Sequence, residues 1–368
     1  MKLLFVGSVY HQHIYYFSKA LRELGQEIFA FDLSGATLDK EEATPYTMVW
    51  SKASYPKNKV IDYICKLFGT IFRFLFIHEK IDVVQFHYMD QFYTLPLILL
   101  SKFKGFKVSC FVYGSDFLQA DYNKKKLLKH IFNKADCVVC DSIALHKELQ
   151  SFSPNNYGKF HVLNFGSVVI DDLYKRMSGK NVITRLHEGK IVVMCGYNGS
   201  PAQNHMKILE SVIDFKDNIH LIIPMTYGGE DSYVARIKHY LDSKGFEYEL
   251  PTDFIPNDVW ESILLKTDIF IHMQDSDSFS SALAEHLFLG HVVINADWLR
   301  YEEFSDNNIY YISSSIDDLA KSFYTVMSDF EGALERHRSN TEKMYKLKSL
   351  TYCCESNWIP YFQKICKK

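Results

Sequence analysis

The stretch "QDSDSFSSALAEHLFLGHVVIN", residues 274–295, contains an acidic, serine-rich turn that leads directly into a helical pattern with Glu285 among apolar side chains. An apolar strand pattern, "DIFIHM" (268–273), precedes the turn, and a second one, "HVVINA" (291–296), follows Gly290. A strand, a helix and a strand in this order predict a parallel β-α-β unit. The turn is therefore expected at the carboxyl end of a parallel strand, where α/β proteins bind their ligands.

Apolar strand patterns alternate with amphipathic helix patterns on both sides of this unit, almost throughout the chain. A weakly patterned polar segment, residues 171–189, interrupts the alternation. A chain of 368 residues also exceeds the size of one typical hydrophobic core. We therefore expect two Rossmann-like α/β domains, residues 1–175 and 190–332, whose parallel sheets face a cleft between them. A helical tail, 333–368, is expected to pack back on the first domain.

The strand patterns are short and bounded by polar or glycine-containing segments, as in parallel sheets whose strands are connected by helices. The strands expected from them cover residues 2–7, 27–33, 82–88, 107–114, 137–141 and 159–166 in the first domain, and 190–196, 219–225, 246–250, 268–273, 291–296 and 308–313 in the second.

The charge of the chain gives no reason to expect a nucleic-acid partner. The formal net charge is −3, from 41 Lys+Arg and 44 Asp+Glu. Residues 1–175 hold 21 basic and 17 acidic side chains, whereas the remainder holds 20 and 27. Opposite signs on the two halves predict two surfaces with different partners. The 8 cysteines are scattered and no signal-peptide pattern follows Met1, so we expect reduced thiols and a cytoplasmic protein.

The segment "VIDYICKLFGTIFRFLFI", residues 60–77, comes nearest to a membrane-spanning run, but Asp62, Lys66 and Arg73 interrupt it. A spanning helix needs about 18 or more apolar residues. On a helix the three charges form one narrow polar stripe beside a broad apolar face. Such a helix is either buried in the first domain or lies in a membrane interface. The lysine-rich segment 123–130 favours an anionic membrane surface, so we expect a protein peripheral to the inner membrane.

The serine-rich turn predicts an anion site. Ser278, Ser280 and Ser281 are N-capping residue types, and the first N–H groups of a helix attract a diphosphate. Glu285 lies about 9 Å along the helix axis, too far to touch a diphosphate but well placed to accept hydrogen bonds from ribose hydroxyls. Asp277 is placed to accept from a sugar beyond the phosphates. The alternative is that Asp277 is a solvated cap and Glu285 a partly exposed helix residue.

The segment "DSFSSALAEHLFLGHVVI" resembles the acid-x7-acid motif of GT-B glycosyltransferases of the family 4 type. Asp277 matches the first acid, Glu285 the second and Gly290 the glycine, while Val292 stands where the family commonly has proline. The resemblance implies a GT-B fold and the transfer of a sugar from a nucleotide-sugar donor with retention of configuration. It also implies that Asp277 and Glu285 belong to the catalytic site.

The N-terminal half is similar to the same family at two places. The segment "MKLLFVGSVYHQHIYYFSKALRELGQEIFAFD" resembles its first strand, loop and helix, although the glycine loop is reduced to Gly7. The segment "FVYGSDF" around Gly114 and Asp116 is similar to the family's "HGsD" stretch, with Tyr113 in place of histidine. The resemblance thus spans nearly the whole chain, through motifs that are each degenerate.

One departure from family 4 concerns the loop after the first strand of the second domain, where the family usually carries an Arg and a Lys that grip the diphosphate. Here "CGYNGSPAQNHMKIL" has no Arg, and Asn204 or His205 occupies the lysine position. Together with "IIPMTYGG" (222–229), this segment looks more like bacterial 4-acetamido-4,6-dideoxygalactose (Fuc4NAc) transferases of surface-polysaccharide pathways. The implied donor contacts are neutral hydrogen bonds to the phosphates and a wall for the base, from Gly196, Asn198, Gly199, Ser200, His205, Tyr227, Gly228 and Gly229.

The triplet "DSD" at 275–277 also matches the metal-binding Asp-x-Asp of GT-A glycosyltransferases, in which two carboxylates hold a divalent ion. The GT-A fold needs this triplet in the middle of a single nucleotide-binding domain. Here the triplet lies three quarters along a two-domain chain. We therefore expect no metal site and no cofactor other than the nucleotide-sugar substrate.

The first domain offers polar side chains for an acceptor at the carboxyl ends of its strands: His11, His13, His87 and Asp116. A histidine with a pKa near neutral suits deprotonation of an acceptor hydroxyl in an inverting enzyme. The acid-x7-acid resemblance favours retention, in which these side chains only position the acceptor. Structural roles for His13 and His87 stay open, as does a structural role for His205 in the second domain.

The sequence therefore predicts a glycosyltransferase of bacterial capsule or O-antigen synthesis, with a saccharide or polyprenyl-linked saccharide as acceptor. One alternative keeps the fold and changes the reaction to that of a UDP-sugar 2-epimerase. Another is a non-catalytic nucleotide- or glycan-binding protein. The basic first domain and the aromatic segment 60–77 favour the glycosyltransferase, because neither alternative needs a lipid-facing surface.

Overall fold

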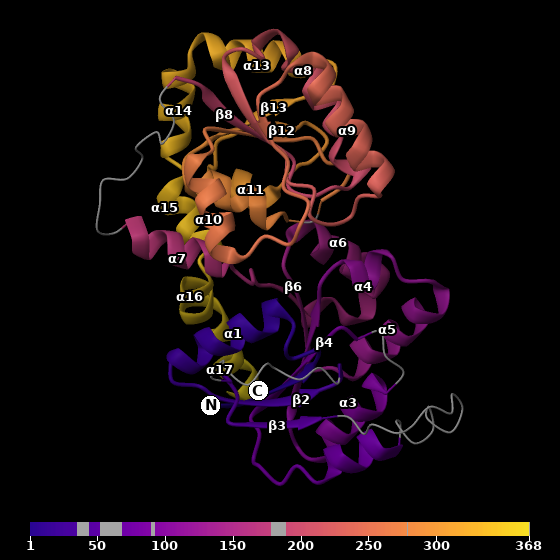
Figure 1. Cartoon of the computed structure of the whole chain (residues 1–368). Helices are drawn as coiled ribbons and strands as arrows, with labels where there is room; N and C mark the ends of the chain where they lie inside the picture. Colours follow the sequence, from indigo (N-terminus) through magenta and orange to yellow (C-terminus); the bar gives the residue numbers. More distant parts are fainter. Residues whose placement is uncertain (35–43, 52–67, 90–92, 178–188, 278, 368) are drawn as a thin grey trace. The chain divides into compact units, whose positions relative to one another are not determined.

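The computed structural model describes the whole chain except residues 35–43, 52–67, 90–92, 178–188, 278 and 368. The chain forms two compact units (Figure 1). Unit 1 comprises Met1–Gly166 together with Leu350–Lys368, and unit 2 comprises Ser167–Ser349. The chain therefore passes between the units twice, once after Gly166 and once after Ser349.

Unit 1 contains a seven-stranded sheet among its described residues, in the order β3-β2-β1-β4-β5-β6-β7. All neighbouring strands are parallel. The chain leaves β1 toward β2 on one side and returns to β4 on the other, so β1 and β4 flank the point where the strand order reverses. The strands are β1 (Lys2–Gly7), β2 (Glu27–Asp32), β3 (Met48–Ser51), β4 (Val83–His87), β5 (Lys107–Val112), β6 (Cys137–Cys140) and β7 (Phe160–Val162).

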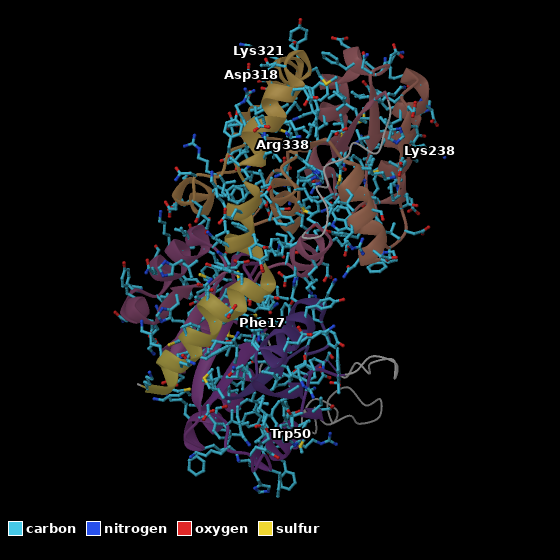
Figure 2. All side chains as sticks on the ribbon, turned by 90° about the vertical axis from the view of Figure 1, so that its left-hand side faces the viewer. Phe17, Trp50, Lys238, Asp318, Lys321 and Arg338 are labelled. Carbon is cyan, nitrogen blue, oxygen red and sulfur yellow. The ribbon has the colours of Figure 1, made fainter. Side chains whose placement is uncertain are left out.

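Helices cover this sheet, and the C-terminal helices lie beside the first helix of the chain (Figure 1). Phe17, labelled in Figure 2, packs against Phe5 of β1 and against Trp358 of the C-terminal segment, with ring centroids 5.5 and 4.9 Å away. The C-terminal segment thus contributes Trp358 to the core of unit 1. The helices are α1 (Gln12–Glu23), residues 68–75, α3 (Thr94–Phe103), α4 (Ser115–Leu118), α5 (Tyr122–Lys134), α6 (Ile143–Phe152), α16 (Leu350–Cys353), a π-helical turn (Cys354–Trp358) and α17 (Ile359–Lys367).

Unit 2 contains a six-stranded parallel sheet among its described residues, in the order β10-β9-β8-β11-β12-β13. Its strands are β8 (Ile191–Cys195), β9 (Ile219–Ile222), β10 (Tyr248–Glu249), β11 (Ile269–His272), β12 (Val292–Ala296) and β13 (Ile312–Ser314). Its helices are α7 (Val168–Met177), α8 (His205–Ser211), α9 (Asp231–Lys244), α10 (Asn257–Lys266), α11 (Ser281–Phe288), α12 (Glu302–Asp306), α13 (Leu319–Ser328), α14 (Phe330–Arg338) and α15 (Thr341–Lys348).

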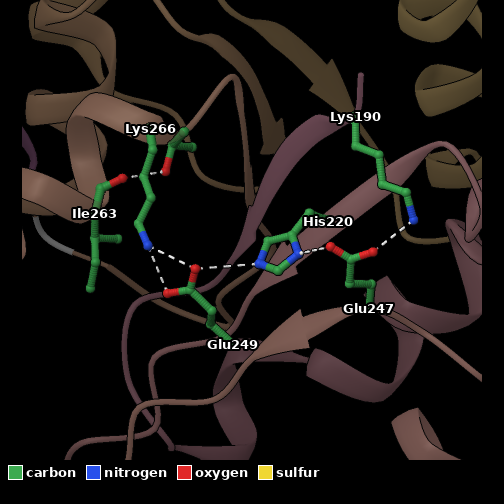
Figure 3. Close-up of polar contacts among 7 residues, drawn as sticks. Lys190, His220, Glu247, Glu249, Ile263 and Lys266 are labelled. Atoms are coloured by element: carbon green, nitrogen blue, oxygen red, sulfur yellow. Dashed lines mark hydrogen bonds and ion pairs between the residues drawn. The ribbon is translucent and has the colours of Figure 1, made fainter. Parts of the chain in front are cut away.

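An ion-pair network covers one edge of this sheet, where the two-residue strand β10 has only β9 as a neighbour (Figure 3). His220 lies between Glu247 and Glu249, 3.0 and 3.4 Å from their carboxylate oxygens. Lys190 pairs with Glu247 at 2.9 Å, and Lys266 pairs with Glu249 at 2.7 Å. A short, charged edge strand resists pairing with another chain, so the network has a structural role.

The observed elements follow the sequence pattern with two differences. Each of the twelve expected strand segments overlaps an observed strand, although β13 shares only its first two residues with the expected 308–313. The strand β3 was not expected, because its four residues alternate little and lie at the edge of the sheet. The segment 171–189, expected to be a linker, begins inside α7, whose Val169, Ile170 and Leu173 are buried in the core of unit 2. The unit boundaries accordingly lie at 166 and 349, not at 175–190 and 333.

Of the expected helix 60–77, residues 60–67 lie outside the described part of the chain, and residues 68–75 are helical. Phe74 and Ile77 are buried, but Phe68, Phe72 and Phe76 are 65, 60 and 54% exposed. The described part of this segment is therefore not buried all round, in contrast to the first of the two alternatives. Within the described chain, no helix has the length and apolar character needed to cross a bilayer.

Candidate functional site

The strand order of unit 2 reverses between β8 and β11, which are neighbours although the chain visits β9 and β10 between them. In open parallel sheets, ligands bind outside the carboxyl ends of the strands at such a point. The loops that follow these two strands, residues 196–204 and 273–280, are therefore the first place to look for a site. Both loops lead into a helix, α8 and α11 respectively.

Gln274, two residues after the end of β11, joins three loops at this edge. Its side-chain oxygen accepts hydrogen bonds from the Tyr197 hydroxyl at 2.7 Å and from the Gln203 amide at 2.9 Å. Its backbone carbonyl accepts one from the Trp298 indole at 2.9 Å. The loops after β8, β11 and β12 are thus fixed to one another by polar side chains. Burial raises the pKa of Tyr197 to about 12, and the nearby Ser280 side chain opposes the shift, so the same cluster reaches the start of α11.

The loop after β8 owes its shape to contact between its backbone and that of residues 227–229. The Gly199 N–H donates to the Tyr227 carbonyl at 2.7 Å. A Cβ added at Gly229 would lie 2.4 Å from the Gly199 oxygen, so no other residue fits there without displacing that backbone. The Ser200 N–H donates to the Asn198 side chain at 2.9 Å. The N–H groups of Gly199 and Ser200 thus have protein acceptors, whereas the sequence analysis assigned these residues to phosphate.

Three further donor-contact candidates, Tyr227, Gly228 and Gly196, differ in exposure and packing. Tyr227, expected to wall the base, is 61% exposed, and the adjacent Gly228 has φ of +79°, which glycine adopts without strain. Gly196 has φ of +63° and is packed tightly by side chains. A Cβ there would lie 2.8 Å from the Gln203 side-chain oxygen and 3.0 Å from His205 Nε2. Gly196 is therefore needed for this close approach.

His205 begins α8 and is fully buried. Its Nδ1 lies 3.2 Å from the Tyr233 hydroxyl, and its Nε2 has no hydrogen-bond partner among the residues that the structure describes. Burial lowers the pKa of His205 to about 4, although the backbone of Asn198 opposes the shift. The imidazole is therefore neutral at pH 7 and cannot replace the missing lysine by charge. It can contribute a neutral hydrogen bond.

The start of α11 is held by the two residue types that the sequence pattern singled out. Ser280 is the N-cap, and its hydroxyl accepts from the Leu283 N–H at 3.3 Å. Asp277 Oδ2 accepts from the Ser280 N–H and from the Tyr301 hydroxyl, each at 2.7 Å. Asp277 therefore caps the helix entrance, as the simpler alternative expected, and is partly exposed at the sheet edge. Ser281 is the first helical residue, and Ser278 lies outside the described residues.

Glu285 lies in the second turn of α11 and is 4% exposed. One carboxylate oxygen accepts from the Ser167 hydroxyl at 2.9 Å, and the other accepts from the Trp260 indole at 2.8 Å. Burial raises the pKa of Glu285 to about 7, against the hydrogen bonds from Trp260 and Ser167, which lower it. The alternative of a partly exposed helix residue is therefore wrong for Glu285. Glu285 is a buried carboxyl group that titrates near neutral pH.

In unit 1 the candidate residues gather at the carboxyl ends of β4 and β5. His87 Nδ1 lies 2.8 Å from the Tyr113 hydroxyl, and Asp116 accepts from the Tyr113 N–H at 3.0 Å. Burial, reinforced by the nearby His11, lowers the pKa of His87 to about 3. So weak a base is poorly suited to take a proton near pH 7, which favours a positioning role over that of general base.

The loop after β1 adds a second, more exposed group. His11 Nδ1 lies 3.3 Å from the Tyr88 hydroxyl, and the His13 ring is 5.3 Å from the His11 ring. Tyr88 has φ of +53° and stacks on Tyr113 at 4.5 Å. A bulky residue in the left-handed region is strained, and such strain concentrates at functional sites. Tyr88 was missed by the sequence analysis, although its position directly after β4 is the same signal that singled out His87.

Both carboxylates of the "DSD" triplet accept hydrogen bonds from protein groups. Asp275 accepts from the Asn204 amide at 2.7 Å, and Asp277 is occupied at the helix entrance. Across the described residues, no group of three or more His, Cys, Asp or Glu side chains is arranged to hold a metal ion.

The fold is one that known enzymes share. No protein-family model and no curated protein matches the sequence. Among solved structures, the chain is similar to a glycosyltransferase from Rickettsia africae ESF-5, with a TM-score of 0.72, 16% identity, and coverage of 100% of this chain and 99% of that chain. It is also similar to sucrose-phosphate synthase from Thermosynechococcus elongatus, with a TM-score of 0.68, 12% identity, and full coverage of both chains.

A third similar structure was solved with a nucleotide. HepE from Anabaena in complex with UDP has a TM-score of 0.68 and 12% identity, with 99% of this chain and 100% of that chain covered. HepE has also been solved with UDP-glucose. Identities this low establish the fold alone. The predicted α/β fold of GT-B type, with a parallel sheet in each of two units, is confirmed.

Proposed function

We propose that the chain is a glycosyltransferase that takes its sugar from a nucleotide-sugar donor bound at the β8–β11 edge of unit 2. The observation that carries the proposal is the start of α11, where Ser280 and Asp277 fix a helix entrance within a cluster of polar side chains. A fold shared over the whole chain with several glycosyltransferases supports it. The UDP and UDP-glucose complexes of HepE support a uridine nucleotide as the first ligand to test.

In this proposal the donor lies along α11. The first turn attracts the diphosphate through its N–H groups and the positive end of the helix dipole. The ribose hydroxyls donate to Glu285, about 9 Å further along the axis. Each carboxylate oxygen can accept a second hydrogen bond besides those from Ser167 and Trp260. Neutral groups of the 196–205 loop complete the phosphate site, and we propose that transfer needs no metal ion.

The first domain is proposed to bind the acceptor through His11, His87, Tyr88 and Asp116 at the carboxyl ends of β1, β4 and β5. The low pKa of His87 supports positioning over proton abstraction, which agrees with the retention implied by the acid-x7-acid resemblance. The resemblance to Fuc4NAc transferases supports a bacterial surface glycan, capsule or O-antigen, as the product.

A thermal shift in the presence of free nucleotides tests the donor site. We expect one of UDP, GDP, dTDP and CMP to raise the melting temperature of the wild-type protein. A ligand at 100 times its dissociation constant adds about 2.7 kcal/mol of stability, which corresponds to several degrees for a domain of this size. If none of the four changes the melting point, and no nucleotide sugar is hydrolysed, the chain is not a nucleotide-sugar enzyme of this kind.

We further propose that unit 1 docks on an anionic membrane, where a polyprenyl-linked acceptor is found. Lys104 donates to the carbonyls of Leu75 and Ile77 at 2.8 and 2.9 Å, which joins helix 68–75 to the end of α3. Exposed apolar side chains on these segments form an aromatic patch, and the lysine-rich helix α5 packs against α3. The patch consists of Phe68, Phe72, Phe76, Leu99 and Phe103, which are 46 to 86% exposed.

Vesicle sedimentation tests the aromatic patch. We expect the protein to bind phosphatidylglycerol vesicles and to bind phosphatidylcholine vesicles much less, because each lysine near an anionic surface contributes about 1 kcal/mol. Replacing Phe72 and Phe103 together by Ser is expected to weaken binding by at least about tenfold, since each phenyl ring loses a favourable transfer of about 1.5 kcal/mol. Phe254→Ser, at an exposed aromatic position of unit 2, is the control. Equal binding by all three proteins contradicts the proposal.

A further inference from the structure

Trp298 is an exposed indole held in a fixed position at the same edge of unit 2. It lies in the loop between β12 and α12, and its side chain is 41% exposed. Its Nε1 donates to the Gln274 carbonyl at 2.9 Å, so the ring is anchored. An anchored, solvent-exposed tryptophan loses little conformational entropy when a ligand covers it, which is why this residue is enriched at binding sites.

The Trp298 loop is attached to the turn before α11 at two points. Trp298 reaches Gln274 at the start of that turn, and the Tyr301 hydroxyl reaches Asp277 near its end, at 2.7 Å. The indole therefore lies beside residues 274–277. Gln274 also accepts from Tyr197 and Gln203, so the anchor is itself fixed from the β8 loop.

The order of groups in a nucleotide sugar predicts which part of the donor lies near Trp298. This inference rests on the proposed donor site. The nucleoside extends from the diphosphate toward Glu285, in the second turn of α11. The transferred sugar is attached to the other end of the diphosphate, so it extends away from Glu285, over the turn 274–277. Trp298 borders that turn.

The side chains around Trp298 suit a pyranose ring. The ring has C–H groups on its faces and hydroxyls around its rim. An indole face packs on the C–H face, while carboxylates accept from the hydroxyls. Asp275 and Asp297 are exposed on either side of this contact, one in the turn and one next to Trp298. We propose that Trp298 is the platform on which the transferred sugar of the donor stacks, and that it contributes to binding of the sugar and not of the nucleotide.

Titration calorimetry with UDP and UDP-glucose tests this assignment. In Trp298→Ala we expect affinity for UDP-glucose to fall by about tenfold, because the lost stacking is on the order of 1.4 kcal/mol. Affinity for UDP is expected to stay within about twofold of the wild type. Trp298→Phe keeps an aromatic face and is expected to retain most of the UDP-glucose affinity. Phe254→Ala, another exposed aromatic position of unit 2, is expected to change neither ligand.

The outcomes separate this inference from the proposed function. Suppose that the wild type binds UDP and UDP-glucose, and that Trp298→Ala lowers the affinity for both ligands equally or for neither. The role of Trp298 as a sugar platform is then wrong, and the proposed donor site stands. If the wild type binds neither ligand, the proposed uridine-nucleotide site fails and the platform fails with it. Tryptophan fluorescence gives a second readout: a spectral change on adding UDP-glucose, absent with UDP, is expected to disappear in Trp298→Phe. A spectral change that UDP-glucose but not UDP produces, and that persists in this variant, contradicts the assignment.

Discussion

Acidification from pH 7 to pH 5 is expected to destabilise unit 2, because its sheet edge and core enclose neutral histidines. His205, His272, His286 and His291 are at most 6% exposed. Burial lowers the pKa of His205 to about 4 and that of His291 to about 3, and it lowers the pKa values of His272 and His286 as well. At pH 5 His205 and His291 are therefore mostly neutral in the folded protein, whereas all four histidines are mostly protonated in the unfolded chain.

The sign follows from linkage. In the unfolded chain these histidines have a pKa near 6.5. Below pH 6.5 the unfolded state therefore binds more protons than the folded state. The free energy of unfolding decreases as the pH is lowered, until the pH reaches the folded-state pKa. At pH 5 the unfolding free energy loses about 2 kcal/mol for each of His205 and His291. The shifts of His272 and His286 act in the same direction. A loss of this size is a large share of a typical stability of about 5–15 kcal/mol.

Glu285 acts in the opposite direction. Its folded-state pKa is raised to about 7, so the stability that its proton contributes is complete below pH 4.5 and is lost as pH rises through 7. When the pH is lowered from 7 to 5, protonation of Glu285 therefore increases the unfolding free energy by about 2 kcal/mol. Glu285→Gln is therefore expected to show a steeper loss of stability on acidification than the wild type.

Urea unfolding at pH 7, 6 and 5 measures this effect, with amide hydrogen exchange in β8 and β11 reporting on unit 2. The exposed His239 provides a matched control, because His239→Gln is expected to leave the slope against pH unchanged. Equal unfolding free energies at pH 7 and pH 5 in the wild type would show that these histidines are not held neutral.

Nucleotide binding is expected to release a proton and to strengthen with pH. In the proposed complex, ribose hydroxyls donate to the ionised form of Glu285, so a bound nucleotide is expected to lower the pKa of this carboxyl group below its free value of about 7. Below pH 7 the ligand must displace a proton, and affinity is expected to fall by about tenfold per pH unit. Above pH 8 the affinity should be constant. Glu285→Gln is expected to weaken binding by about 1.5–3 kcal/mol at pH 8, the value of hydrogen bonds to a charged group.

Titration calorimetry in two buffers of different ionisation enthalpy measures the released proton directly. Ser167→Ala is the informative companion, because it removes one hydrogen bond that lowers the pKa of Glu285. The pH profile of binding is therefore expected to move to higher pH in this variant. Affinity that is flat from pH 6 to pH 8 in the wild type, or that depends on pH equally in Glu285→Gln, would falsify the role of this carboxylate.

The periodicity of the sequence predicted the strands of both sheets because each is a short apolar run between helices. The edge strand β3 was not predicted, because a run of four residues that pairs with one neighbouring strand shows too little hydrophobic alternation. The boundary after Gly166 was also not predicted. The polar residues of α7 suggested a linker, but Asp171 is held by a hydrogen bond from Ser349, and a contact between positions 178 residues apart leaves no local signal.

The candidate site shows the same limit. Capping chemistry and spacing predicted that Asp277, Ser280 and Glu285 lie on one helix entrance, and the structure has them there. The burial of Glu285 depends on Ser167 and Trp260, which are 118 and 25 residues away. No pattern within a single helix contains that information, so the sequence left a partly exposed Glu285 open as an alternative.

The position of a residue just after a strand predicts that it lies at the ligand-binding edge of the sheet, and this rule was applied to only some of the residues that meet it. Tyr197 and Gln274 each stand within two residues of a strand end in unit 2, and Tyr88 directly follows a strand in unit 1. Their position alone marks them as members of a sheet edge where ligands bind. Gly199 and Gly229 were expected to contact the donor, whereas in the structure they permit two loops to touch.

A crystal structure of the protein grown with UDP tests the account most directly. The account predicts the diphosphate at the first turn of α11, beside Ser280 and Tyr197, with the ribose hydroxyls within hydrogen-bonding distance of Glu285. UDP bound elsewhere, with Glu285 still held only by Ser167 and Trp260, would contradict it.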